Sequence, residues 1–155
     1  RGELLPPRSH LAGRVRTSSS GSDSTAGASE RLRYSACGIG RLRDRAREAQ
    51  RAGALLVDSR EEKRYQGLEE PIDPVAGHIP GAINRPWQGV TCAAGKALDL
   101  SGQREHWGDA LESGQIVVYC GSGVTACVNL FSLALLGRDD ATLYAGSWSD
   151  WCSYL

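Results

Sequence analysis

The segment from Gln115 to Leu136 constrains the fold more than any other part of the chain. It opens with the apolar run QIVVY at 115–119, continues with CGSGVT at 120–125 and ends with the apolar stretch 126–136. A short run of β-branched apolar residues predicts a buried strand, and a helix that is apolar on most faces is expected to be buried. Two glycines in the hexapeptide predict a tight loop. The segment therefore predicts a strand, a loop and a buried helix in direct succession.

Apolar runs alternate with helix-favouring segments along the rest of the folded part. We expect strands at 54–58, 82–84, 115–119 and 142–144. We expect helical segments at 41–52, 60–66, 102–113, 126–136 and from 147 to 151, with a long ordered loop at 67–81 that is rich in Pro and Gly. This alternation predicts an α/β fold with a mainly parallel sheet.

Residues 1–40 have a different composition from the rest of the chain. Thr17–Ser29 is rich in Ser and Gly and contains no apolar residue larger than Ala, so it cannot offset the entropy cost of ordering. Residues 1–53 hold eleven Arg and five acidic residues, a charge pattern that nucleic-acid or membrane contact would also produce. We favour a solvated flexible leader at 1–40 and one domain at 41–155, with neither a nucleic-acid nor a membrane partner. Because the sequence contains no Met and begins with Arg1, we expect a fragment or a processed chain.

The five cysteines are an odd number, and no C-x-x-C pair occurs among Cys37, Cys92, Cys120, Cys127 and Cys152. This pattern favours neither a disulfide framework nor a zinc site, so we expect no metal. Free thiols fit a reducing compartment, and we expect a cytoplasmic protein. Cys127 lies inside the apolar stretch and is expected in the core.

Cys120 is the candidate nucleophile. The strand before it delivers the thiol to the carboxyl edge of the sheet, where α/β proteins bind their ligands. The glycines let backbone N–H groups of the loop point inward, and the following helix start adds positive potential. Such surroundings favour the thiolate, which is the reactive form of cysteine. The alternative from spacing alone is an inert buried thiol.

A cysteine phosphatase would also place its nucleophile in a loop before a helix. Those enzymes use C-x5-R, in which the arginine grips the phosphate. Here the residue six positions after Cys120 is Ala126, and no Arg occurs from 121 to 137. The phosphatase alternative therefore lacks its essential charge.

Four motifs in register resemble a known family. They are LLVDSR at 55–60, GHIPGAINRP at 77–86, CGSGVTAC at 120–127 and LYAGSWSDW at 143–151. Together they resemble the second, catalytic domain of the tandem-domain thiosulfate and 3-mercaptopyruvate sulfurtransferases of the rhodanese type. The resemblance covers residues 41–155 and implies a small α/β domain with a central parallel sheet flanked by helices.

The resemblance also implies a reaction and its residues. Cys120 would attack the outer sulfur of a small anionic donor, become a persulfide, and pass the sulfur to a thiol or cyanide, with no cofactor. Arg64 matches the family arginine that binds the donor, and Asp58 and Arg60 match a supporting pair beside the site. The remaining substrate-binding residues are those of the loop, namely Gly121, Ser122, Gly123, Val124 and Thr125.

Two further features bear on the donor and on the assembly. Gly121-Ser122 is typical of mercaptopyruvate enzymes, although Asp73 stands where those enzymes often carry a second arginine. The family also places a His and an Asp of a first domain against the loop serine, so the resemblance implies an N-terminal rhodanese-like domain as partner. The alternative function is a non-catalytic rhodanese-like module for regulation or docking. Such modules usually lack the cysteine that is present here at position 120.

Overall fold

The computed structural model describes residues 39–155, and their side chains from residue 42 onward. Cys37 and nearly all of the expected leader lie outside the described residues. The first helix begins at Ile39, two residues before the start predicted from the sequence.

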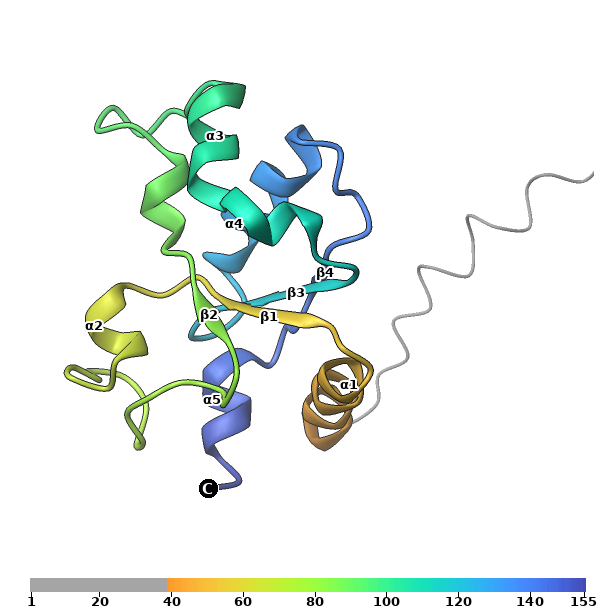
Figure 1. Ribbon diagram of the computed structural model, residues 1–155. Coiled ribbons are helices and arrows are strands. Elements are labelled where there is room, and N and C mark those ends of the chain that lie inside the picture. Colours follow the sequence, from red (N-terminus) through yellow and green to blue (C-terminus); the bar gives the residue numbers. More distant parts are fainter. Residues whose placement is uncertain (1–38) are drawn as a thin grey trace, which may run out of the picture. The chain divides into compact units, whose positions relative to one another are not determined.

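Four strands form one sheet in the order β2-β1-β3-β4 (Figure 1). They are β1 (Leu55–Asp58), β2 (Ile83–Asn84), β3 (Ile116–Tyr119) and β4 (Thr142–Leu143). All three pairings are parallel. Asp58 is in register with both Asn84 and Tyr119, so β1, β2 and β3 end together at one edge of the sheet. The predicted α/β class with a parallel sheet is confirmed.

Helices cover both faces of the sheet, as expected. The α-helices are α1 (Ile39–Arg51), α2 (Glu62–Tyr65), α3 (Leu100–Trp107), α4 (Ala126–Leu135) and α5 (Ser147–Cys152). Two 3-10 helices are η2 (Trp87–Val90) and η3 (Gly108–Glu112). Figure 1 shows α1 and α5 on one side of the strands and α3 and α4 on the other.

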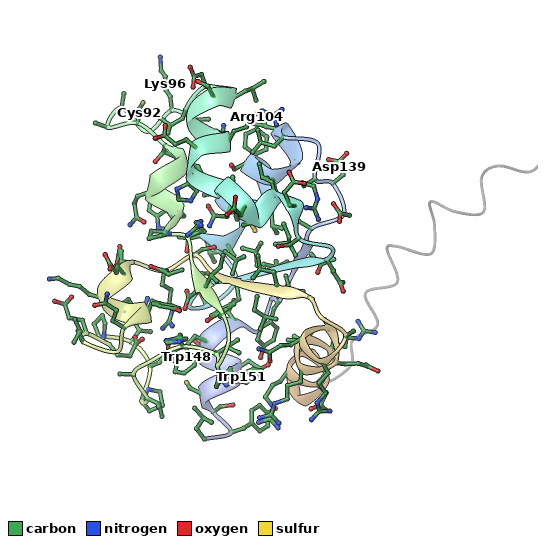
Figure 2. The ribbon with its side chains drawn as sticks, in the orientation of Figure 1. Cys92, Lys96, Arg104, Asp139, Trp148 and Trp151 are labelled. Carbon is green, nitrogen blue, oxygen red and sulfur yellow. The ribbon has the colours of Figure 1, made fainter. Side chains whose placement is uncertain are left out.

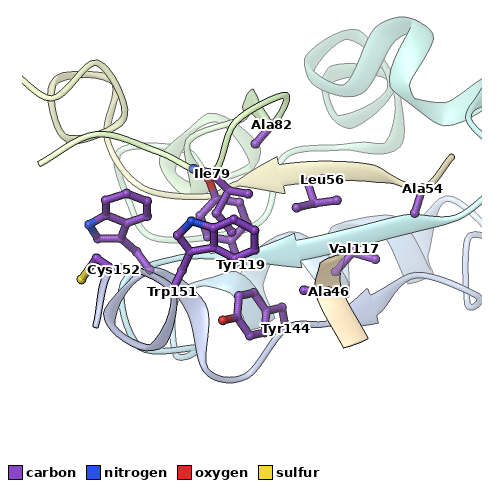
Figure 3. Packing of buried hydrophobic residues seen from close by; sticks show 11 residues of the cluster. Ala46, Ala54, Leu56, Ile79, Ala82, Val117, Tyr119, Tyr144, Trp151 and Cys152 are labelled. Carbon is purple, nitrogen blue, oxygen red and sulfur yellow. Dashed lines mark hydrogen bonds between the residues drawn. The ribbon is translucent and has the colours of Figure 1, made fainter. Parts of the chain in front are cut away.

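The central strands are apolar throughout because both of their faces are buried. On the α1/α5 face, Leu56, Val117 and Tyr119 pack with Ala46 and Trp151 (Figure 3). The residues between them in sequence turn to the other face, because successive side chains of a strand alternate. That second cluster contains Val57, Trp107, Ile116, Val118 and Leu133. Each such large side chain contributes about 1.5–3 kcal/mol through burial.

The helix predicted at 102–113 is in fact two segments. It begins earlier, at Leu100, because the Asp99 side chain caps it by accepting the N–H of Gly102 at 2.8 Å. It ends at Trp107 because Gly108 adopts a positive φ of 50°. The remaining turn, η3, is a separate 3-10 helix.

The expectation that α4 is buried on most faces is wrong. Phe131 is 60% exposed, and Cys127, expected in the core, is exposed as well. The buried residues of this helix are Ala126 and Leu133 together with the polar Asn129 and Ser132. Their partners explain this: Ser132 Oγ accepts the Trp107 indole N–H at 2.8 Å, and Asn129 donates to two loops. An evenly apolar sequence cannot indicate which face meets the sheet.

Candidate functional site

Cys120 follows β3 directly and lies at the carboxyl edge of the sheet. Although only 2% exposed, it lines a pocket of about 190 Å³. The pocket residues are Arg64, Ile72, Cys120, Gly121, Ser122, Val124, Thr125 and Ser149. The fold thus brings Arg64 and four of the five predicted loop residues together around Cys120. Ile72 and Ser149 were not among the residues predicted from the sequence.

The sulfur of Cys120 is surrounded by hydrogen-bond donors. The backbone N–H of Gly123 donates to Sγ at 3.1 Å. Burial raises the pKa of the thiol, but the Thr125 hydroxyl and the N–H groups of Ala126, Ser122 and Gly123 act in the opposite direction and outweigh it. The pKa of Cys120 therefore lies below its ordinary value, which favours the thiolate.

Gly123 completes this loop in a way that no other residue could. Its φ is +86°, and a Cβ at this position would lie 2.7 Å from the carbonyl oxygen of Ala145. Gly123 is the one predicted loop residue that does not line the pocket. Its backbone N–H instead donates to the sulfur of Cys120.

The first residues of α5 hold the thiol loop in place through hydrogen bonds to Cys120 and Gly121. Ser147 Oγ accepts the N–H of Cys120 at 3.2 Å and donates to the Tyr144 carbonyl at 2.9 Å. The N–H groups of Trp148 and Ser149 donate to the carbonyls of Cys120 and Gly121, each at 3.0 Å. These carbonyls are thereby held away from the thiol, so the loop presents N–H groups to the sulfur.

Ser147 was missed by the sequence reasoning. It is fully buried and has a φ of 55°, a conformation that only a constrained non-glycine residue adopts. A small hydroxyl residue inside the GSW motif at 146–148 was the available signal.

Asp58 and Arg60 form the buried pair that the sequence predicted. Arg60 donates to both Asp58 oxygens, with Nη2 to Oδ2 at 2.7 Å, and Nη1 donates to Glu70 at 3.0 Å. Its guanidinium also lies 5.0 Å from the ring centre of Trp148. The pair fixes the loop around Glu70 and the first turn of α5. Neither side chain lines the pocket.

Arg64 lies against the loop from Cys120 to Thr125. Its Nη1 is 3.5 Å from the position that a Cβ on Gly121 would take. Its Nη2 donates to Glu70 at 2.5 Å and to Asp73 at 3.4 Å. The sequence predicted Arg64 as the donor-binding residue but did not predict that two carboxylates would hold it.

Glu70 links the two arginines of the site. Burial raises the pKa of its carboxyl group, but the hydrogen bonds from Arg64 and from the N–H groups of Asp73 and Ile72 outweigh burial and lower it. Glu70 therefore stays ionised between Arg60 and Arg64. The acidic run after Arg64 was visible in the sequence, but its partners were not.

Asn129 connects α4 to the loops that follow β1 and β2. Its Nδ2 donates to Ser59 Oγ at 2.9 Å and to the Arg85 carbonyl at 2.7 Å.

Among residues 39–155, no group of three or more His, Cys, Asp or Glu side chains could hold a metal ion. No helix within this range is long and apolar enough to cross a membrane.

The fold agrees with comparisons to known proteins. The model of the rhodanese-like domain family matches residues 42–154, so the chain belongs to that family. The "Probable 3-mercaptopyruvate sulfurtransferase" of Pseudomonas aeruginosa is 45% identical over 102 residues, which are 64% of this chain and 36% of that protein. The "Putative thiosulfate sulfurtransferase SseB" of Mycobacterium tuberculosis is 44% identical over 117 residues, or 73% and 40% of the two chains.

A solved structure shows the same fold. The crystal structure of SseA from Escherichia coli, described as a 3-mercaptopyruvate sulfotransferase with the rhodanese fold, matches with a TM-score of 0.55 and 32% identity. The match covers 69% of this chain and 40% of SseA. The chain thus spans two fifths or less of the length of these three relatives.

Proposed function

We propose that this domain is a sulfurtransferase that carries a sulfane sulfur on Cys120 as a persulfide. The observation that supports it most directly is the Gly123 N–H placed 3.1 Å from Sγ at a pocket lined by Arg64. This arrangement supplies a stabilised thiolate, room for a small donor and one cation for an anionic group. The relatives named as sulfurtransferases support the same reaction class.

The reaction has two halves. In the first, the Cys120 thiolate attacks the outer sulfur of the donor, an S–S bond forms, and the bond from that sulfur to the rest of the donor breaks. The leaving group keeps the electron pair: thiosulfate releases sulfite, and 3-mercaptopyruvate releases the enolate of pyruvate, which is then protonated. In the second half, a thiol or cyanide acceptor takes the outer sulfur and returns the Cys120 thiolate.

The residues of the pocket have distinct proposed roles. N–H groups of the loop stabilise the negative charge on the thiolate and on the persulfide. Ser122 and Thr125 offer hydroxyl groups to the donor, and Arg64 attracts its anionic end. Asp58 and Arg60 act only by holding the surrounding loops in place.

We propose 3-mercaptopyruvate or thiosulfate as donor, and a direct assay separates the two. Turnover with each donor is measured at equal concentration with cyanide and with a small thiol as acceptors. Mass spectrometry of the donor-treated protein, without acceptor, should find the mass of one extra sulfur atom on the Cys120 peptide. Cys127→Ser is the matched control, because Cys127 is exposed, does not line the pocket, and a serine can keep its hydrogen bond to the Gly123 carbonyl. The absence of the adduct with both donors would overturn the proposal.

We also propose that a second domain completes the active site in the working protein. Ile72 and Val124 line the pocket and are 73% and 71% exposed, an apolar rim that a second domain would cover. The greater length of the relatives supports this proposal. The four cysteines among residues 39–155 are free, which supports a reducing compartment such as the cytoplasm.

A further inference from the structure

The electrostatics of the pocket raise a question that the proposed reaction leaves open. Arg64 is the one cationic side chain among the pocket residues of the described chain. A sulfur donor must bring an anionic group next to a thiolate, so the charge of the pocket decides which donors enter.

The positive charge of Arg64 is already neutralised by its neighbours. Glu70 and Asp73 both accept from its Nη2, and their side chains are only 4% and 7% exposed. With Asp58 and Arg60, the buried cluster contains three carboxylates and two guanidinium groups. The formal net charge of this cluster beside the pocket is −1.

The two carboxylates on Arg64 differ in what else they do. Glu70 also binds Arg60 at 3.0 Å and accepts the N–H groups of Ile72 and Asp73, each at 3.2 Å, so it is needed for the loop. The Asp73 carboxylate has Arg64 as its hydrogen-bond partner within residues 39–155, at the long distance of 3.4 Å. Asp73 is therefore the charge that can be removed with least damage to the fold.

We propose that Asp73 selects the sulfur donor by its charge. Its carboxylate competes with the donor for Arg64 and repels anions from the pocket, and the repulsion doubles for a dianion. A donor with one carboxylate and an organic body, such as 3-mercaptopyruvate, is accepted in preference to thiosulfate. The exposed apolar side chains of Ile72 and Val124 at the pocket suit a carbon skeleton better than an inorganic ion. This inference rests on the proposed sulfurtransferase function, from which the two donors are taken.

The Asp73→Asn variant tests this inference because it removes the charge and keeps the shape. We expect kcat/KM for thiosulfate to rise about ten-fold and that for 3-mercaptopyruvate about three-fold, since the Coulomb energy scales with donor charge. The change should appear in KM, with kcat nearly constant, because Asp73 acts on binding. Asp73→Glu, which keeps the charge, should retain the preference of the native protein.

Asp139→Asn is the matched control for net charge. Asp139 is exposed in the loop before β4 (Figure 2). It therefore precedes its strand, whereas Cys120 follows the parallel strand β3. This variant should leave the kinetic constants for both donors unchanged. An equal gain for the two donors in Asp73→Asn, or a similar gain in Asp139→Asn, would overturn the inference.

A second measurement does not depend on turnover. Iodoacetate and iodoacetamide alkylate the same thiol but differ by one negative charge. Mass spectrometry of the Cys120 peptide measures both rates of alkylation. The rate with iodoacetate divided by the rate with iodoacetamide should rise about three-fold in Asp73→Asn. An unchanged ratio refutes charge selection by Asp73. If the native protein forms no persulfide with either donor, the proposed function fails, and the alkylation ratio still decides the role of Asp73.

Discussion

Two thiols of this domain lie in glycine-containing turns, and only one has the surroundings of a reactive centre. Cys92 is exposed in the turn between η2 and α3, where its backbone bonds to Lys96 and Gly95, at the other end of the domain from Trp148 (Figure 2). N–H groups of Lys96 and Ala94 lower the pKa of its thiol. Cys120 has a lowered pKa as well, but it is buried and lines a pocket.

The difference shows that a lowered thiol pKa does not by itself make a site. Around Cys92, the described residues supply N–H groups from one short turn, and Cys92 does not line the pocket that contains Cys120. Around Cys120, the donors belong to a loop held by β3, α4 and α5, with Arg64 beside it. Sulfur transfer requires that second kind of support, because a bound donor must be positioned as well as attacked.

The largest expected effect separates the two thiols completely. Cys120→Ser should abolish persulfide formation and turnover, because serine has no thiolate that could form an S–S bond with the donor sulfur. Cys92→Ser should change neither, although that thiol also ionises easily. Donor-dependent sulfur addition followed by peptide mass spectrometry measures both variants. Turnover in Cys120→Ser would contradict the assignment.

A second test compares the glycines of the two turns. Gly123→Ala should reduce turnover about a hundred-fold or more, since the methyl group would meet the Ala145 carbonyl and displace the N–H that faces the sulfur. Gly95→Ala has a similar positive φ of 72° but no atom within 4 Å of the new methyl group. It should cost about 1 kcal/mol of stability and leave turnover intact. Steady-state rates and thermal unfolding measure the contrast.

The brace from α5 gives a smaller effect. Ser147→Ala leaves the N–H of Cys120 without its acceptor and should reduce turnover about ten-fold, at a cost of about 1–2 kcal/mol in unfolding free energy. Ser153→Ala is the control, because Ser153 Oγ donates only to the Asp150 carbonyl at the end of the same helix. Equal losses of turnover in the two variants would show that the contact of Ser147 with Cys120 has no specific effect on the thiol loop.

The smallest effect concerns the Cys120 thiol alone. Thr125→Val removes a hydroxyl that lowers its pKa, so the pKa of Cys120 should rise. At a pH below the native pKa, alkylation of Cys120 should then slow about three- to ten-fold, because fewer molecules hold the thiolate. Alkylation of Cys92 in the same sample should keep its native pH dependence. A shift at both thiols would point to a general change of the fold.

The sequence predicted the parts of the site that are local and missed those that depend on distant segments. The loop from Cys120 to Thr125 was readable because a strand, two glycines and a helix follow one another. The contact of Arg64 with Asp73 depends on how the 67–81 loop returns to the pocket, and no periodicity encodes that path. The Ser147 contact likewise joins residues 27 positions apart.

The same limit explains the wrong expectations for α4. Apolar side chains at almost every position of a helix leave its buried face undetermined, because hydrophobicity then has no direction. Asn129 and Ser132 decide it through specific partners, which only the assembled sheet provides. Cys127 was misplaced for this reason.

The brace between α5 and the thiol loop has a consequence for biosynthesis. Cys120 is synthesised before Ser147, Trp148 and Ser149, although all three hold its loop in the finished domain. A nascent chain that ends before Ser147 therefore contains this cysteine without the contacts that organise its loop. The order of translation delays the reactive centre until the domain is almost complete, and a polypeptide released before α5 would carry the thiol without the means to use it.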